Sequence, residues 1–188
     1  MLPLGTPAPD FALQDVVSGK TVALADFKNS PALLVAFLCN HCPYVKHIQA
    51  GFTQLAKDVQ AQGVGVVAIS SNDVANYPDD SPEKMRDEAR RAGYAFPYLF
   101  DEAQSVALAY RAACTPDFFL FDGSQRLVYR GQMDDARRGN DLPVTGATLR
   151  VAVAAILSGR EISPLQIPSL GCNIKWKPGN EPDYFRLV

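Results

Sequence analysis

Apolar residues along this chain follow first a strand pattern, then a helix pattern, then a strand pattern again. Continuous apolar runs at 31–39 and 64–70 predict two strands that are buried on both faces. Between the runs, apolar residues recur every three or four positions from Val45 to Val59, which predicts one apolar stripe on a helix that ends near Gly63. Residues 32–70 therefore predict a strand–helix–strand unit, in which two parallel strands are joined by a right-handed crossover.

The rest of the pattern extends this unit into an α/β domain. Turn residues between alternating runs predict two hairpins, and cap residues beside amphipathic runs predict further helices. The expected elements are hairpins at 10–27 and 117–131, helices at 81–93, 105–113 and 145–159, and a short strand at 96–100. After residue 160 the periodicity stops. We therefore expect one domain at 1–160 and an extended tail at 161–188 that packs on it, with Trp176 as its anchor.

Composition excludes several classes of function. The chain has 188 residues, of which 47% are hydrophobic and 20% charged, and its net charge is −2. This balance gives no electrostatic attraction to nucleic acid or to an anionic membrane, and the longest apolar run is too short to span a bilayer. The start of the chain lacks the basic and apolar regions of a signal peptide, so we expect a cytoplasmic protein. In that compartment four cysteines indicate redox chemistry or metal binding.

Two of the cysteines, Cys39 and Cys42, are separated by Asn40 and His41. Cys39 follows the buried strand at the expected start of the helix, where free backbone N–H groups and the helix dipole would stabilise a thiolate. We therefore expect Cys39 to have a lowered pKa, with further stabilisation from His41. Cys42 lies close enough to form a disulfide with it. One acidic thiol beside a second thiol is suited to thiol–disulfide exchange.

The alternative for these residues is zinc. Cys39, Cys42 and His47 could supply three ligands, with Cys114 or Cys172 as the fourth. Structural zinc sites usually carry a second cysteine or histidine pair at short spacing, which this chain lacks. We therefore expect no metal at this site.

A second motif, Thr115-Pro116, comes directly before an apolar strand. Proline removes a backbone donor there, so it is either an ordinary turn residue or part of a cis-proline loop that faces the cysteine pair. Cys114 next to it is either a buried, inert cysteine or an additional redox thiol. For Cys172, in the tail, the sequence leaves open a free thiol, a buried one and a distant resolving cysteine.

The order of elements, the cysteine pair at the start of the crossover helix and the Thr-Pro before the hairpin resemble the thioredoxin superfamily. The opening "LGTPAPDFALQD…GKTVALADFK" resembles its AhpC/TSA branch, which includes peroxiredoxins and TlpA/ResA-type oxidoreductases, and the resemblance covers roughly residues 3–158. It implies a thioredoxin-like fold, with a central mixed sheet, helices on both faces and an added N-terminal hairpin. It also implies that Cys39 attacks, that Cys42 resolves, and that Thr115 and a cis Pro116 bind an extended substrate.

The chain departs from the family at Ala36. Thioredoxins carry a buried acid in this strand, and peroxiredoxins carry a threonine three residues before the peroxidatic cysteine; both places fall on Ala36. The leading hypothesis is therefore a thiol–disulfide oxidoreductase without cofactor, which acts on protein or small-molecule thiols and disulfides and is served by a partner reductase. The alternatives are a peroxiredoxin-like peroxidase with Cys39 as peroxidatic cysteine and, from another class, a metal-binding or metal-delivery protein.

Overall fold

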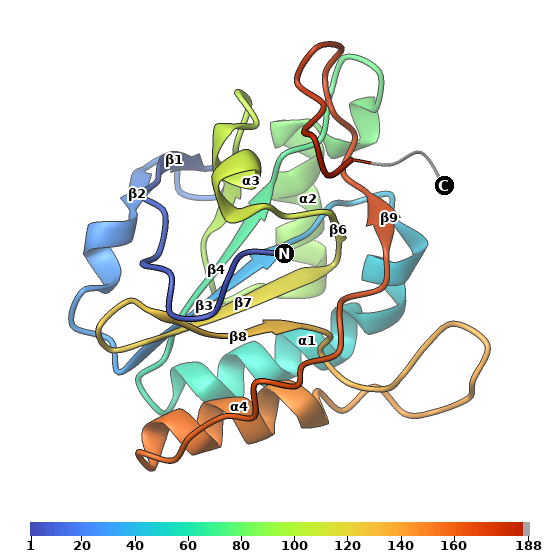
Figure 1. Ribbon diagram of the computed structural model, residues 1–188. Helices are drawn as coiled ribbons and strands as arrows, with labels where there is room; N and C mark the ends of the chain where they lie inside the picture. Colours follow the sequence, from blue (N-terminus) through green and yellow to red (C-terminus); the bar gives the residue numbers. More distant parts are fainter. Residues whose placement is uncertain (186–188) are drawn as a thin grey trace.

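The computed structural model describes residues 1–185 and shows a thioredoxin-like α/β fold around one central sheet (Figure 1). Seven strands form this sheet in the order β2-β1-β5-β4-β3-β7-β8. The strands are β1 (Ala12–Asp15), β2 (Thr21–Ala23), β3 (Ala32–Phe37), β4 (Gly65–Ser70), β5 (Tyr98–Phe100), β7 (Asp117–Asp122) and β8 (Leu127–Gly131). The expected mixed sheet and N-terminal hairpin are thus confirmed.

The strand–helix–strand unit forms as the apolar pattern predicts. β3 and β4 pair in parallel, with Val35 opposite Val67, and all six residues of β3 are buried. The connection between them is α1 (Pro43–Gln60). On its other edge β3 pairs antiparallel with β7, so β3 is an interior strand of the sheet, and from it the chain enters α1. The carboxyl end of β3 therefore lies near the start of β7.

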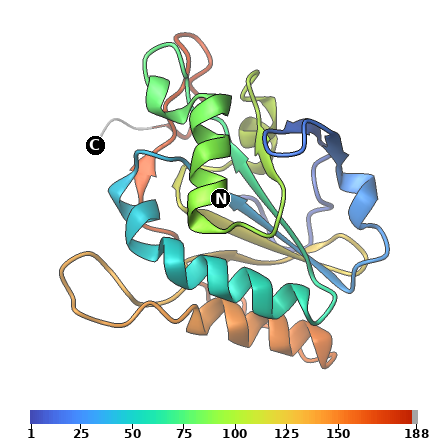
Figure 2. The ribbon, with the colours of Figure 1, turned by 180° about the vertical axis from the view of Figure 1, so that it is seen from behind.

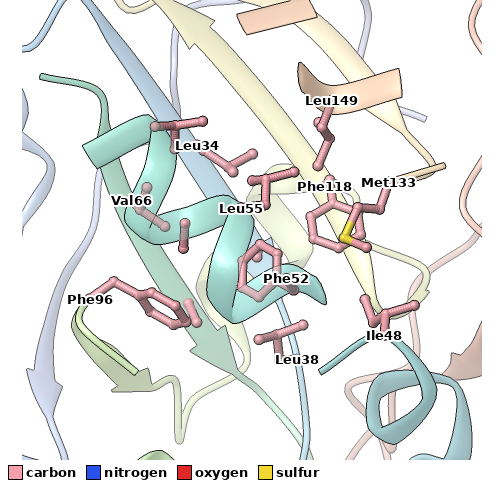
Figure 3. Close-up of a cluster of buried hydrophobic side chains, with 14 of the residues drawn as sticks. Leu34, Leu38, Ile48, Phe52, Leu55, Val66, Phe96, Phe118, Met133 and Leu149 are labelled. Atoms are coloured by element: carbon pink, nitrogen blue, oxygen red, sulfur yellow. The ribbon is translucent and has the colours of Figure 1, made fainter. Parts of the chain in front are cut away.

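Helices cover both faces of the sheet. On one face α1 packs with α2 (Pro82–Ala92) and α4 (Ala147–Leu157), and Figure 2 shows this layer from behind. The core of this layer surrounds Phe52, between Leu34 and Val66 of the sheet and Leu149 of α4 (Figure 3). On the other face the short α3 (Ser105–Tyr110) covers a second apolar cluster. Two short 3-10 helices, η1 (Leu24–Phe27) and η2 (Pro78–Asp80), complete the domain.

The tail follows the surface of the domain without regular structure until it reaches a second, two-stranded sheet. In this sheet β9 (Cys172–Asn173) pairs antiparallel with β6 (Cys114–Thr115), which lies directly before β7 (Figure 1). Beyond β9, Trp176 is buried in the cluster under α3, so its expected role as an anchor is confirmed.

The boundaries of two helices differ from the expectation. The helix expected at 105–113 ends at Tyr110, because Arg111 adopts the left-handed conformation (φ 51°). The crossover helix begins at Pro43, after both cysteines of the pair. Within residues 1–185 no helix combines the length and the apolar character that crossing a membrane requires.

Candidate redox site

The fold brings both sequence motifs together at the carboxyl end of β3. Cys39 and Cys42 lie in the link between β3 and α1, and Thr115-Pro116 lies in the link between β6 and β7. Because β3 and β7 are paired, with Phe37 opposite Asp117, the two links are neighbours. The site is closed to solvent: Cys39 is 2% exposed and Cys42 is fully buried.

Thr115 contacts both sulfurs of the pair. Its hydroxyl lies 3.2 Å from the Sγ of Cys39, and its carbonyl oxygen accepts a 3.1 Å hydrogen bond from the Cys42 thiol. The peptide bond between Thr115 and Pro116 is cis, as the resemblance implies. This loop therefore holds the two sulfurs side by side.

Of the two thiols of the reduced pair, Cys42 is the more acidic. The Cys39 thiol donates a hydrogen bond to the Cys42 sulfur, which also accepts from the backbone N–H of Val45 and of Cys172, and these donors lower the pKa of Cys42 to about 4. The same hydrogen bond to Cys42, together with burial and the nearby Asp80 carboxylate, raises the pKa of Cys39 well above its usual range.

The expectation of an acidic Cys39 is therefore wrong, and the start of the helix explains why. Cys42 is the N-cap of α1 and the helix begins at Pro43, so Cys39 lies three residues before the cap and outside the first turn, where the free N–H groups are. Proline is favoured at the first position of a helix, so Pro43 is the sequence signal that marks this boundary.

His41 lies beside the pair but is bound by Asp80. Its Nδ1 is 2.6 Å from the Asp80 carboxylate, and its ring stacks on Tyr77 at 5.5 Å. The same carboxylate accepts hydrogen bonds from the backbone N–H groups of Asn40 and His41 and from the side chain of Asn72, at 2.7, 3.2 and 2.7 Å. A positive charge on His41 would thus face a carboxylate as well as the sulfur of Cys39.

Asp80 is a buried acid beside the pair that the sequence pattern does not predict. The acidic run around it reads as a solvated loop and helix start, yet Asp80 is fully buried while its neighbour Asp79 is exposed. No local pattern separates the two, because the donors that bind Asp80 come from residues 40, 41 and 72. Asp80 supplies a buried acid beside the pair, in a chain that has Ala36 where thioredoxins carry theirs.

The residues that could bind a metal differ from the zinc ligands considered above. In the described part of the chain, the ligand atoms of Cys39, His41 and Asp80 lie within 4.8 Å of one another, and His47 is not among them. The Asp80 carboxylate already accepts four hydrogen bonds, so binding a metal would require it to give some of them up.

The two remaining cysteines have different surroundings. Cys114 is buried, its Sγ lies 3.5 Å from the carbonyl of Pro116, and burial raises its pKa well above the usual range, which fits an inert thiol. Cys172 is half-buried and lies opposite Thr115 in the β6–β9 pair, where it contacts Cys42. The backbone of Thr115, expected to bind an extended substrate, is thus paired with the chain's own tail.

Comparison with known proteins places the chain in a family. Two solved structures are each 54% identical to it with a TM-score of 0.93: an uncharacterized conserved protein from Geobacillus kaustophilus, with 95% of each chain covered, and a hypothetical protein from Sinorhizobium meliloti, with 95% of this chain and 97% of that one covered. The thioredoxin domain of a thiol-disulfide oxidoreductase from Bacteroides vulgatus shares the fold at 20% identity, with a TM-score of 0.61 over 81% of this chain and 99% of that one. No curated protein matches the chain. The AhpC/TSA family model matches residues 4–130, well over half of the chain, so the protein belongs to the AhpC/TSA family.

Proposed function

We propose that this protein is a thiol–disulfide oxidoreductase that uses Cys39 and Cys42 as its redox pair. The observation that carries the proposal is the contact of both sulfurs with one residue, Thr115, next to a cis-proline. The hydrogen bond between the two thiols supports it, since sulfurs in contact need little movement to form a disulfide.

The arrangement fits both states of the pair. In the reduced state the pKa of Cys42 is lowered and that of Cys39 is raised, so a thiolate forms at Cys42 once its thiol gives up the proton that it donates to the Thr115 carbonyl. In the oxidised state the two sulfurs are joined and carry no charge. A well-stabilised thiolate favours the reduced form, so we infer an oxidising disulfide. The Asp80 carboxylate near Cys39 disfavours negative charge on that sulfur.

We propose further that a partner reductase or a small thiol of the cytoplasm reduces the pair. The chemistry requires no metal or organic cofactor, since each exchange step moves a disulfide bond from one pair of sulfurs to another.

The test is a side-by-side assay of the purified protein with a protein disulfide and with an organic hydroperoxide. We expect wild type to reduce the disulfide in the presence of a dithiol, and we expect Cys39→Ser and Cys42→Ser to lose this activity. The variant Cys114→Ser is the matched control, because Cys114 is buried nearby but contacts neither sulfur of the pair by hydrogen bond. Disulfide reduction that survives both serine substitutions would refute the proposal.

One observation favours a peroxidase as the second candidate. Ala36 removes the threonine that peroxiredoxins carry in this strand, but the hydroxyl of Thr115 lies 3.2 Å from Cys39 and offers a hydrogen bond from another loop. The peroxidase hypothesis predicts turnover of the hydroperoxide in this assay, and loss of that turnover in both Cys39→Ser and Thr115→Val. The metal-binding alternative predicts instead a bound metal, detectable by elemental analysis of the purified protein and lost in Asp80→Asn.

A further inference from the structure

The tail strand occupies the backbone edge beside the redox pair. Cys172 lies opposite Thr115 in the antiparallel β6–β9 register, and the Thr115 carbonyl oxygen is 3.1 Å from the Sγ of Cys42, so Cys172 lies beside Cys42. Cys42 therefore lies between two thiols, Cys39 on one side and Cys172 on the other. An extended segment that presents a cysteine to the pair is what a disulfide substrate would offer, and here it belongs to the chain itself.

The tail is fixed on both sides of Cys172. Before it, the Ile167 carbonyl accepts from the N–H of Gln132 at 3.0 Å, and the hydroxyl of Ser169 donates to Gly131 at 2.7 Å. After it, the Lys175 carbonyl accepts from the side chain of buried Gln104 at 2.9 Å and from a backbone N–H at 2.7 Å. These hydrogen bonds on both sides of Cys172 hold the tail, and with it Cys172, at the site.

At Gly171 the backbone of the tail lies very close to the backbone of Thr115. A Cβ atom at this position would lie 2.1 Å from the Thr115 carbonyl oxygen, a distance that two backbones cannot tolerate without moving apart. Glycine is thus required for the tail to lie this close to the cis-proline loop.

Access to the site points to what Cys172 does. Cys39 and Cys42 are buried, so a bulky disulfide has no path to either sulfur, whereas Cys172 is half-buried and in contact with Cys42. We propose that Cys172 is the third thiol of the redox site and relays exchange between external disulfides and the buried Cys39–Cys42 pair. This inference rests on the proposed function and adds the residue at which substrates react.

The relay is balanced at each step. The Cys172 thiolate attacks an external disulfide, which releases one substrate thiolate and leaves Cys172 in a mixed disulfide. Cys42 then attacks the Cys172 sulfur, which releases the second substrate thiolate and forms a Cys42–Cys172 disulfide. Finally Cys39 attacks Cys42, which forms the Cys39–Cys42 disulfide and returns Cys172 as a thiolate. The net change is that Cys39 and Cys42 are oxidised and one external disulfide is reduced. The proton that Cys172 loses before its attack and the proton that Cys39 loses before its own pass to the two substrate thiolates.

The electrostatics of the site favour the reverse direction of this exchange. Burial, the hydrogen bond to Cys42 and the charge on Cys42 raise the pKa of Cys172 to about 11, while Lys175 and Arg138 act in the opposite direction. Once Cys42 is bonded to Cys39 it carries no charge, so the effect of Cys42 on Cys172 disappears and the thiolate of Cys172 becomes easier to form. Cys172 is thus most reactive when the pair is oxidised and an exchange partner is needed.

A trapping experiment tests the contact directly. In Cys39→Ser the last step is blocked, so oxidation with diamide or oxidised glutathione should leave a Cys42–Cys172 disulfide, read by non-reducing peptide mass mapping. Cys39→Ser/Cys114→Ser should keep this disulfide, and Cys39→Ser/Cys172→Ser should lose it. A glutathione adduct that persists on Cys42 beside a free Cys172 would overturn the proposal.

A turnover experiment separates the relay from the proposed function. Cys172→Ser should lose reduction of a protein disulfide, while its Cys39–Cys42 pair should still be oxidised by diamide; circular dichroism of the variant checks that it is folded. If wild type reduces no disulfide at all, the proposed function fails, yet the trapping result still decides whether Cys172 reaches Cys42. Full turnover by folded Cys172→Ser would overturn the relay and leave the proposed function standing.

Discussion

Replacing Asp80 by asparagine should make the redox pair more oxidising and the protein less stable. A carboxylate oxygen of Asp80 lies within 4.8 Å of the Cys39 sulfur. Two unit charges at that distance repel each other by about 3 kcal/mol at an effective dielectric constant of about 20, which is about two pKa units. Asp80→Asn removes this repulsion, so negative charge on the reduced pair becomes more favourable and the reduction potential rises.

The rise in reduction potential depends on how much of the repulsion between Asp80 and the charge of the reduced pair is removed. Each 1.4 kcal/mol corresponds to about 30 mV for a two-electron couple, and because the charge rests mainly on Cys42, we expect a rise of about 20 to 50 mV. Asparagine can still accept from the N–H groups of Asn40 and His41, but its amide cannot accept from His41 Nδ1 or from Asn72. Loss of these two hydrogen bonds should lower the free energy of unfolding by about 2 to 4 kcal/mol.

The potential is measured from the redox equilibrium of the protein with glutathione, and the stability from urea denaturation of the reduced form. Asp79→Asn is the matched control, since it makes the same change of charge one residue away on an exposed side chain. It should leave both quantities close to wild type, because charges in water are screened. A potential that is unchanged or lower in Asp80→Asn would refute the assignment of Asp80 as the acid that acts on the pair.

Three further predictions concern the core, the tail and the pH dependence. Phe52→Ala should lower the free energy of unfolding by about 3 to 5 kcal/mol, measured by urea denaturation, because Phe52 is 1% exposed and packs against Phe96 and Phe118; a loss below about 1 kcal/mol would contradict this packing. Gly171→Ala should displace the tail strand, so that Cys172 is alkylated faster than in wild type; an unchanged rate would show that the close approach to Thr115 is not required. Burial raises the pKa of Asp117 to about 6, so its protonated form contributes stability below about pH 4 that is lost as pH rises through 6. Asp117→Asn should therefore be more stable than wild type at pH 7 but not at pH 4, and an equal gain at both values would contradict the shift.

The sequence pattern predicts the sheet and its helices because each depends on a local period. β3 and β4 are continuous apolar runs, and α1 repeats apolar residues every three or four positions, so their type and order can be predicted without any knowledge of the partners they contact. The contact between the cysteine pair and Thr115 also follows, since paired strands place the links at their ends side by side.

The parts of the site that the pattern does not predict depend on distant partners. β9 has two residues, too few for any period, and the contacts that position it come from residues near 104 and 131. Asp80 differs from Asp79 only in the donors that surround it, which lie up to 40 residues away along the chain. Long-range hydrogen bonds of this kind leave no trace in the spacing of apolar residues.

The assignment of charge within the pair shows how a small local error changes the chemistry. A helix that began at Cys39 would direct its free N–H groups at that sulfur, and Cys39 would be the acidic thiol. The helix begins at Pro43 instead, so Cys42 is the N-cap and Cys39 lies three residues before it, outside the first turn. A shift of three residues thus takes Cys39 out of the first turn and leaves Cys42, which lies beside the paired Thr115 and Cys172, as the more acidic thiol. The position of one proline therefore determines which thiol of the pair is poised to exchange with the tail.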